Sequence, residues 1–224
     1  MSRRISPWMA VVALGFALLA GGCEDLGLAT YLAHGPAPVE PQYVPYKEPM
    51  LVLVECYGST GSVNVDVARL SSSLVKELQD NKVAPIIDPN KLVQFRDKDP
   101  EGYSKMGITD IGRKLGARQV LYVNVTYADL DVPGDTPMIR GTISATVRIV
   151  DADSALTRWP ASPQDGMVVN AKSPWIRTDE SNAQTDAHNQ MTDTLATRIG
   201  NLFHEWQPEH DIATDDDQNQ SSPY

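Results

Sequence analysis

Cysteine and histidine are the residue types in this 224-residue sequence that most readily act as nucleophiles or metal ligands. The chain has two cysteines and four histidines, His34, His188, His204 and His210. Histidines that bind one metal from a helix are about four residues apart, whereas His188 and His204 are separated by 16 positions. The sequence also lacks the Gly-x-Ser-x-Gly pattern of a serine nucleophile. We therefore expect no catalytic residue, no metal site and no cofactor, and we predict that the protein is not an enzyme.

The net charge excludes one class of partner. Lysine and arginine number 19, aspartate and glutamate number 29, and the formal charge is -10. Binding to nucleic acid depends on clustered basic side chains that neutralise phosphates. We therefore predict that the protein does not bind nucleic acid.

The first 22 residues have the pattern of a bacterial secretion signal. Arg3 and Arg4 provide positive charge, and residues 8–20 form an apolar run. This run of about 13 residues is too short to cross a bilayer, which needs about 20. The small residues Gly21 and Gly22 follow it, as expected before a cleavage site. We predict that residues 1–22 are a signal peptide.

Cys23 follows directly, and residues 19–23 (Leu-Ala-Gly-Gly-Cys) resemble the lipobox of bacterial lipoproteins. The resemblance implies cleavage between Gly22 and Cys23, with acyl chains such as palmitate on Cys23. Ala20 stands where the family usually has Leu, and an ordinary signal peptide followed by an unrelated cysteine is the alternative. Acyl chains contribute about 0.8 kcal/mol per buried methylene, so several would anchor the protein to a membrane. Glu24 rather than Asp follows the cysteine, which favours an outer-membrane anchor facing the periplasm over an inner-membrane one.

Composition divides the rest of the chain into three segments. Residues 23–49 contain five prolines and should form an extended, lipidated tether. Residues 207–224 are acidic and almost without apolar side chains, which predicts a disordered tail. Residues 50–206 should form a single domain between them.

Apolar spacing within residues 50–206 predicts an α/β fold with a mixed sheet. Strands are expected at residues 51–56, 83–87, 119–125, 142–149, 156–159 and 168–169, and helices at residues 67–78, 92–95, 108–115 and 187–206. Polar and apolar residues alternate along 142–149, which indicates one face exposed to water. The order is βαβ(α)αβ, followed by a β-meander and a C-terminal helix.

Two short motifs give this order a family resemblance. A helix that ends in Leu-Gly-Ala (residues 115–117) precedes a strand, and a later strand is followed by an Asp-Ala-Asp turn (residues 151–153) and Trp159. Both motifs resemble those of the TolB N-terminal-domain-like fold of CsgG-type secretion lipoproteins and LpoB-type activators of peptidoglycan synthases. The resemblance covers residues 50–206 and implies a domain that binds other envelope proteins and has no catalytic residues.

We accordingly expect a lipid-anchored envelope protein that binds a protein partner and assists envelope assembly or a synthase or transport complex. A CsgG-like secretion-channel component is the alternative, and an envelope hydrolase is a more distant one. Residues 129–137 are too few for a membrane-spanning hairpin, and residues 156–178 contain prolines and charges, which disfavours the channel. Because binding residues concentrate on loops, the predicted partner surface is Asp129, Asp131 and Asp135.

Replacing Cys23 with Ala should abolish lipidation, because the thiol that receives the lipid is removed. Mass spectrometry of the mature wild-type protein should show an acylated amino terminus at Cys23, and the Cys23→Ala protein should retain its signal or be cut elsewhere. An unmodified amino terminus at another residue of the wild-type protein would contradict the lipobox interpretation.

Overall fold

The structure is a computed structural model that describes residues 37–134, 136–162 and 165–208. The predicted signal peptide, Cys23, the first part of the predicted tether and residues 209–224 of the predicted tail lie outside the described residues. The described chain divides into two units. Residues 41–204 form the larger unit, and residues 37–40 with 205–208 belong to the smaller one, in which Val39 and Trp206 exchange backbone hydrogen bonds of 2.8 and 3.2 Å.

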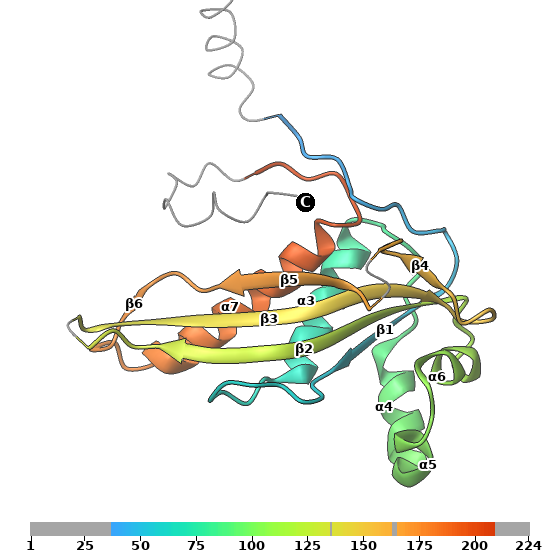
Figure 1. The fold of residues 1–224 in the computed structure, drawn as a ribbon, viewed down its shortest axis with the longest axis horizontal. Helices are drawn as coiled ribbons and strands as arrows, with labels where there is room; N and C mark the ends of the chain where they lie inside the picture. The colour runs from blue at the N-terminus through green and yellow to red at the C-terminus, as the bar shows by residue number, and fades with distance from the viewer. Residues whose placement is uncertain (1–36, 135, 163–164, 209–224) are drawn as a thin grey trace, which may run out of the picture. The chain divides into compact units, whose positions relative to one another are not determined.

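The sheet of the larger unit is organised around its two longest strands, β2 (Gln119–Asp131) and β3 (Met138–Asp151), which pair antiparallel (Figure 1). The register shifts between Val125 and Tyr127, so Thr126 forms a β-bulge. A one-residue insertion reverses which residues face the core. Because of this bulge, Val125 and Ala128 are buried on the same face although three positions separate them.

The remaining strands add to both edges of this pair. β1 (Met50–Glu55) lies parallel to β2. The free edge of β3 pairs antiparallel with β4 (Thr157–Trp159), β5 (Met167–Lys172) and β6 (Ile176–Arg177). The result is a six-stranded mixed sheet, which confirms the expected α/β class with a mixed sheet.

Two helices, α3 (Val67–Asp80) and α7 (Ala183–Gly200), pack on one face of the sheet. Asp66 precedes α3, and its side chain accepts a 2.9 Å hydrogen bond from the Arg69 N–H and so caps the helix. The helices bury apolar residues spaced three or four apart, namely Leu70, Leu74 and Leu78 of α3 and Met191, Leu195 and Ile199 of α7. None of the helices in the described part of the chain has the length and apolar character needed to cross a membrane.

Three shorter helices cover the opposite face only at its β1 end: α4 (Pro89–Lys98), α5 (Pro100–Ser104) and α6 (Ile108–Lys114) (Figure 1). Leu51 and Leu53 of β1 belong to this cluster, whereas Val52 and Val54 belong to the core under α3. Alternate residues of a strand point to opposite faces, so β1 is apolar throughout because both of its faces are covered.

Several predicted elements differ from the structure. Residues 83–87 do not form a strand and make only a bridge between Ile86 and Met50, because Pro85 has no N–H to donate. The C-terminal helix ends at Gly200 rather than at residue 206, and Phe203 is buried beyond its end. β2 and β3 continue well past the predicted residues 125 and 142, because the backbone ladder does not depend on apolar side chains.

Residues 41–49, which were expected to belong to the tether, pack on the domain, and we call them the strap. The Tyr43 N–H donates to the Leu202 carbonyl at 3.1 Å, and the Tyr43 ring stacks on Trp159 with centroids 6.4 Å apart. Lys47 Nζ donates to the Val83 carbonyl at 3.0 Å. The larger unit therefore begins at residue 41 rather than at residue 50. Prolines exclude regular structure from the strap but do not prevent it from packing.

Arg158 of β4 joins the strap to the turn that follows β3. Its Nε donates to Asp151 Oδ2 at 2.9 Å, its Nη1 lies 3.2 Å from Glu48 Oε2, and its guanidinium carbon lies 4.6 Å from the Tyr46 ring centroid. Asp151 also accepts a 2.8 Å hydrogen bond from the Ser154 N–H. This bond, together with Arg158, holds the pKa of Asp151 well below its ordinary value. The ion pair therefore fixes both the turn and the strap.

Replacing Tyr43 with Ala should lower the free energy of unfolding by about 1–3 kcal/mol, because the change removes a partly buried ring that packs on the core. Val44 is the matched control: its side chain is 63% exposed, so Val44→Ala should change stability by less than about 0.5 kcal/mol. Urea unfolding of the two variants measures the difference. Equal effects would mean that the strap is not part of the folded domain.

Candidate functional site

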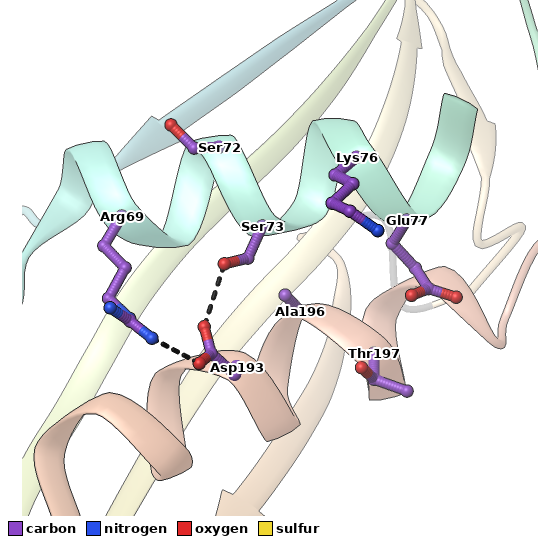
Figure 2. A pocket seen from close by; sticks show the side chains of 8 residues that line it. All are labelled: Arg69, Ser72, Ser73, Lys76, Glu77, Asp193, Ala196 and Thr197. Atoms are coloured by element: carbon purple, nitrogen blue, oxygen red, sulfur yellow. Dashed lines mark hydrogen bonds and ion pairs between the residues drawn. The ribbon is translucent and has the colours of Figure 1, made fainter. Parts of the chain in front are cut away.

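A groove of about 440 Å³ lies between α3 and α7 (Figure 2). It is lined by Arg69, Ser72, Ser73, Lys76, Glu77, Asp193, Ala196 and Thr197. Arg69 Nη2 lies 2.5 Å from Asp193 Oδ2, and Ser73 Oγ donates to Asp193 Oδ1 at 2.8 Å. Figure 2 shows both side chains of α3 reaching across to the same carboxylate of α7. The polar groups of the groove therefore link the two helices to each other.

Several polar side chains of this groove pair with each other or with a neighbouring turn of helix. The hydroxyl of Ser73 donates to the carboxylate of Asp193, which also pairs with Arg69. Lys76 pairs with Asp80 at 2.6 Å, one turn further along α3. In the part of the chain that the structure describes, no group of three or more His, Cys, Asp or Glu side chains could hold a metal ion.

The opposite face of the sheet has a different character, because α4–α6 cover only its β1 end. Beyond them, no described helix covers the outward side chains of β2, β3 and β5. We call this region the open face, which consists of Asn124, Tyr127, Asp129, Asp131, Arg140, Thr142, Ser144, Thr146, Arg148, Val168, Asn170 and Lys172. All of these side chains are partly or fully exposed. The register aligns them in rows across three strands: Ser144 lies between Tyr127 and Asn170, and its Oγ is 2.6 Å from Asn170 Oδ1.

An arginine stacked on an aromatic ring lies near each end of the open face. The Arg148 guanidinium lies 5.2 Å from the centroid of Tyr122, and the Arg140 guanidinium lies 4.2 Å from the centroid of Trp175. The two arginines are eight positions apart on β3, a span of roughly 27 Å at 3.4 Å per residue. Stacking restrains each long side chain, so less conformational entropy is lost if a partner contacts it.

The structure places two of the predicted partner residues in a strand. Asp129 and Asp131 belong to β2, not to a loop, because the β2–β3 ladder continues to the end of β2. The predicted loop placement is therefore wrong for these two acids, and Asp135 lies outside the described residues. Asp131 is exposed and accepts a 3.1 Å hydrogen bond from Thr142 Oγ1.

Asp129 differs from Asp131 because its carboxylate holds a neighbouring loop. It accepts hydrogen bonds from the hydroxyl of Ser62, from the Leu130 N–H at 2.9 Å and from the Tyr127 hydroxyl at 3.2 Å. These bonds, that from Ser62 foremost, hold the pKa of Asp129 below its ordinary value. The side chain is already engaged within the protein.

The loop between β1 and α3 is positioned by backbone contacts as well. The Ala128 N–H donates to the Thr60 carbonyl at 3.0 Å, so the loop continues the edge of the sheet after β1 ends. Gly61 has a φ of +109°, and a Cβ there would lie 1.9 Å from the Ala128 oxygen. Only glycine fits this close approach, which places Ser62 opposite Asp129.

The sequence contained part of the signal for the open face. The alternation along residues 142–149 predicted one polar face of β3, and the structure confirms it. The sequence did not predict which side chains of β2 and β5 belong to the open face. These side chains lie beside those of β3 only because of the register in which the strands pair. The bulge at Thr126 also interrupts the alternation in β2.

Comparison with known proteins gives structural similarity only. No protein-family model matches the sequence, and no curated protein matches it. Among solved structures, lipoprotein GNA1162 from Neisseria meningitidis is 13% identical with a TM-score of 0.46, over 69% of this chain and 99% of that one. The PelC dodecamer from Paraburkholderia phytofirmans is 10% identical, with a TM-score of 0.39 over 75% and 97% of the two chains. The LpoB C-terminal domain from Escherichia coli is 15% identical, with a TM-score of 0.36 over 56% and 82%.

The similar structures thus include bacterial lipoproteins. The TM-scores of these three structures are all below 0.5.

Replacing Asp129 with Ala should lower the melting temperature and accelerate amide exchange in the loop between β1 and α3, because the loop loses its side-chain anchor. Asp131→Ala is the control and should behave like the wild type. The pKa of Asp129 is lower in the folded protein than in the unfolded chain, where it is about 3.9, so ionised Asp129 stabilises the fold at pH values above 3.9. This stabilisation is lost as the pH falls through the folded-state pKa. The difference between the variants should therefore disappear in strong acid. Identical melting at neutral pH would show that Asp129 does not hold the loop.

Proposed function

We propose that the protein is a lipid-anchored component of the bacterial cell envelope whose α/β domain binds an envelope protein through the open face. Acyl chains on Cys23 would attach it to the outer membrane, facing the periplasm. The observation that carries the proposal is the open face itself, a polar surface of three strands with a stacked arginine near each end. Arginine, tyrosine and tryptophan are the residue types most enriched where binding energy concentrates in protein interfaces.

A non-catalytic role is part of this proposal. In the groove between α3 and α7, Arg69 and Ser73 both pair with Asp193, and Lys76 pairs with Asp80. These observations support a binding domain over an envelope hydrolase.

We also infer that the fold is of the TolB N-terminal-domain-like type. α6 is followed by Gly116, whose φ of +81° ends the helix directly before β2. The turn after β3 is built on Asp151 and leads to Trp159 in β4. Both motifs that carried the sequence resemblance therefore occupy the expected junctions.

The secretion-channel alternative is disfavoured by packing rather than by length. The sequence suggested that residues 129–137 were too short for a membrane-spanning hairpin. β2 and β3 are longer than that segment, so the length of the hairpin does not argue against a secretion channel. However, one face of β3 is buried against α7, and the other carries Arg140 and Arg148. Each arginine would cost about 2–4 kcal/mol in contact with the lipid core.

Placing a large charged side chain in the middle of the open face should prevent partner capture. Thr146→Arg introduces that obstacle on β3, and it should leave the melting temperature nearly unchanged because the position is only partly buried. Ser72→Arg is the matched control, because Ser72 is an exposed residue of the α3–α7 groove on the opposite side of the sheet.

Affinity capture from the native envelope, followed by quantitative mass spectrometry, compares the two variants with the wild type. We expect Thr146→Arg to lose proteins that both the wild type and Ser72→Arg retain. Loss with Ser72→Arg alone would assign binding to the helical face instead. Capture that neither variant alters would refute the open face as the docking surface.

A further inference from the structure

β5 is an edge strand of the sheet, because it pairs with β3 on one side and with no other described strand (Figure 1). The backbone N–H and C=O groups of successive residues in a strand alternate in direction, so every second residue of an edge strand points these groups away from the sheet. Outward groups of this kind are bonded by another backbone, by side chains or by water. The residues of β5 that point outward therefore decide what this edge can bind.

Two hydrogen bonds show which residues of β5 point outward. The Ser173 N–H, directly after β5, donates to the Gly141 carbonyl of β3 at 2.9 Å and therefore points inward. The Asn170 carbonyl accepts a 2.9 Å hydrogen bond from Arg198 Nη1 of α7, and it therefore points away from β3. Both observations agree with strict alternation, because three positions separate the two residues of β5 and its continuation.

The register of β5 with β3 is continuous, which extends this alternation to the rest of the strand. Val168 and Lys172 point their N–H and C=O groups outward, as Asn170 does, while Val169 and Ala171 bond to β3. Apart from the Asn170 carbonyl, these outward groups make no hydrogen bond to any residue that the structure describes. The edge of β5 thus presents an alternating row of backbone donors and acceptors.

At the opposite edge of the sheet, the outward groups are bonded or covered. Met50 of β1 points outward, and its N–H and carbonyl bond to backbone groups of residues 85–87 at 2.8 and 2.9 Å. Val52 and Val54 are the next outward residues of β1, and they are only 4% and 7% exposed. Val168 is 60% exposed, so the β5 edge is the one that a partner can reach.

We propose that the protein that docks on the open face contributes an extended segment, which pairs with the edge of β5 as an added strand. The identity of the partner rests on the proposed function, whereas the chemistry of the pairing does not. The backbone of an extended peptide matches an alternating row of N–H and C=O groups, and this is how peptides are added to exposed sheet edges. The added strand would lie beside Val168 and Lys172, and it would extend the open face by one row of side chains.

The charge near this edge favours an acidic segment over a second copy of the chain. Arg140 and Arg148 of β3 and Lys172 of β5 belong to the open face, whereas its two described aspartates lie on β2, on the far side of β3 from the edge. A second copy would bring the same basic side chains to the shared edge, where like charges repel. Acidic side chains at alternate positions of an added strand would instead face the basic ones.

Val168→Pro tests the pairing, because proline removes an outward N–H that β3 does not use. Val168→Ala is the matched control, since it shortens the same side chain but keeps the N–H. Among the proteins that the wild type captures from the native envelope, we expect Val168→Pro to lose about tenfold of those that Val168→Ala retains. Thermal melting of both variants checks that they are folded. Equal capture by the two folded variants would overturn the pairing.

A second pair of variants tests the charge without changing the backbone. Lys172→Glu reverses the charge beside the edge, and Lys172→Gln only removes it. Because the added segment is acidic, Lys172→Glu should capture several-fold less partner than Lys172→Gln does. Equal capture by these two variants would contradict the acidic character of the segment.

Amide hydrogen exchange of the full-length protein in detergent identifies what lies on the edge. In the free protein, the N–H groups of Val168 and Lys172 should exchange rapidly and those of Val169 and Ala171 slowly. Adding the captured partner should slow exchange at Val168 and Lys172. Two results would overturn the proposal: protection of Val168 that rises with protein concentration would assign the edge to a second copy, and protection that deletion of residues 209–224 removes would assign it to the chain's own C-terminal segment.

The same variants separate this proposal from the proposed function. If Thr146→Arg blocks capture and Val168→Pro does not, the partner uses the open face without adding a strand, and the pairing is wrong. If Val168→Pro blocks capture and Thr146→Arg does not, the pairing stands and the open face is not the docking surface.

Discussion

The antiparallel pairing of β2 with β3 is the constraint on which the rest of the molecule depends. It joins Gln119 to Asp151 at one end and Asp131 to Arg140 at the other, so both strands are extended over their full length. A paired strand sends alternate side chains to opposite faces, and the bulge at Thr126 adjusts the alternation so that Ala128 still faces the core. One face is consequently apolar along the whole pair, and the other is polar beyond its first residues.

The helices follow from this division of faces. α3 and α7 pack on the apolar side, where their periodic leucines, Met191 and Ile199 complete the core. α4–α6 are short and cover only the apolar start of β1 and β2 on the other side. The strap is attached near the end of β3, because Arg158 pairs with both Asp151 in the sheet and Glu48 in the strap. Breaking one member of a partly buried ion pair leaves the other without compensation, so this junction couples the chain that leads from the predicted lipid anchor to the sheet.

The two faces of the sheet therefore differ in how their polar side chains are engaged. On the helical side, charged and hydroxyl groups pair with each other, as Arg69 and Ser73 do with Asp193, and they hold two helices together. On the open side, Arg140 and Arg148 stack on aromatic rings. Polar groups that pair within the protein gain little from a partner, whereas an arginine already restrained by stacking loses less conformational entropy when a partner contacts it. This contrast is why we place partner binding on the sheet.

The sequence by itself determined the α/β class, the mixed order of elements, and most helices and strands, because period-two and period-3.6 patterns are local properties of the chain. α3 matches its prediction since Leu70, Leu74 and Leu78 recur on one helical face. The lipid anchor at Cys23 is also a sequence prediction, and it stays one because that residue lies outside the described chain. Tertiary structure alone decided which polar residues form one surface, since Asp129 and Asp131 lie in a strand only because β3 pairs with them. It also decided that the strap packs, through contacts to residues 202 and 159 that are more than 100 positions away. Local patterns report the solvation that each side chain favours, whereas register and long-range contacts depend on which segments meet, and that information is not carried by any single stretch of the chain.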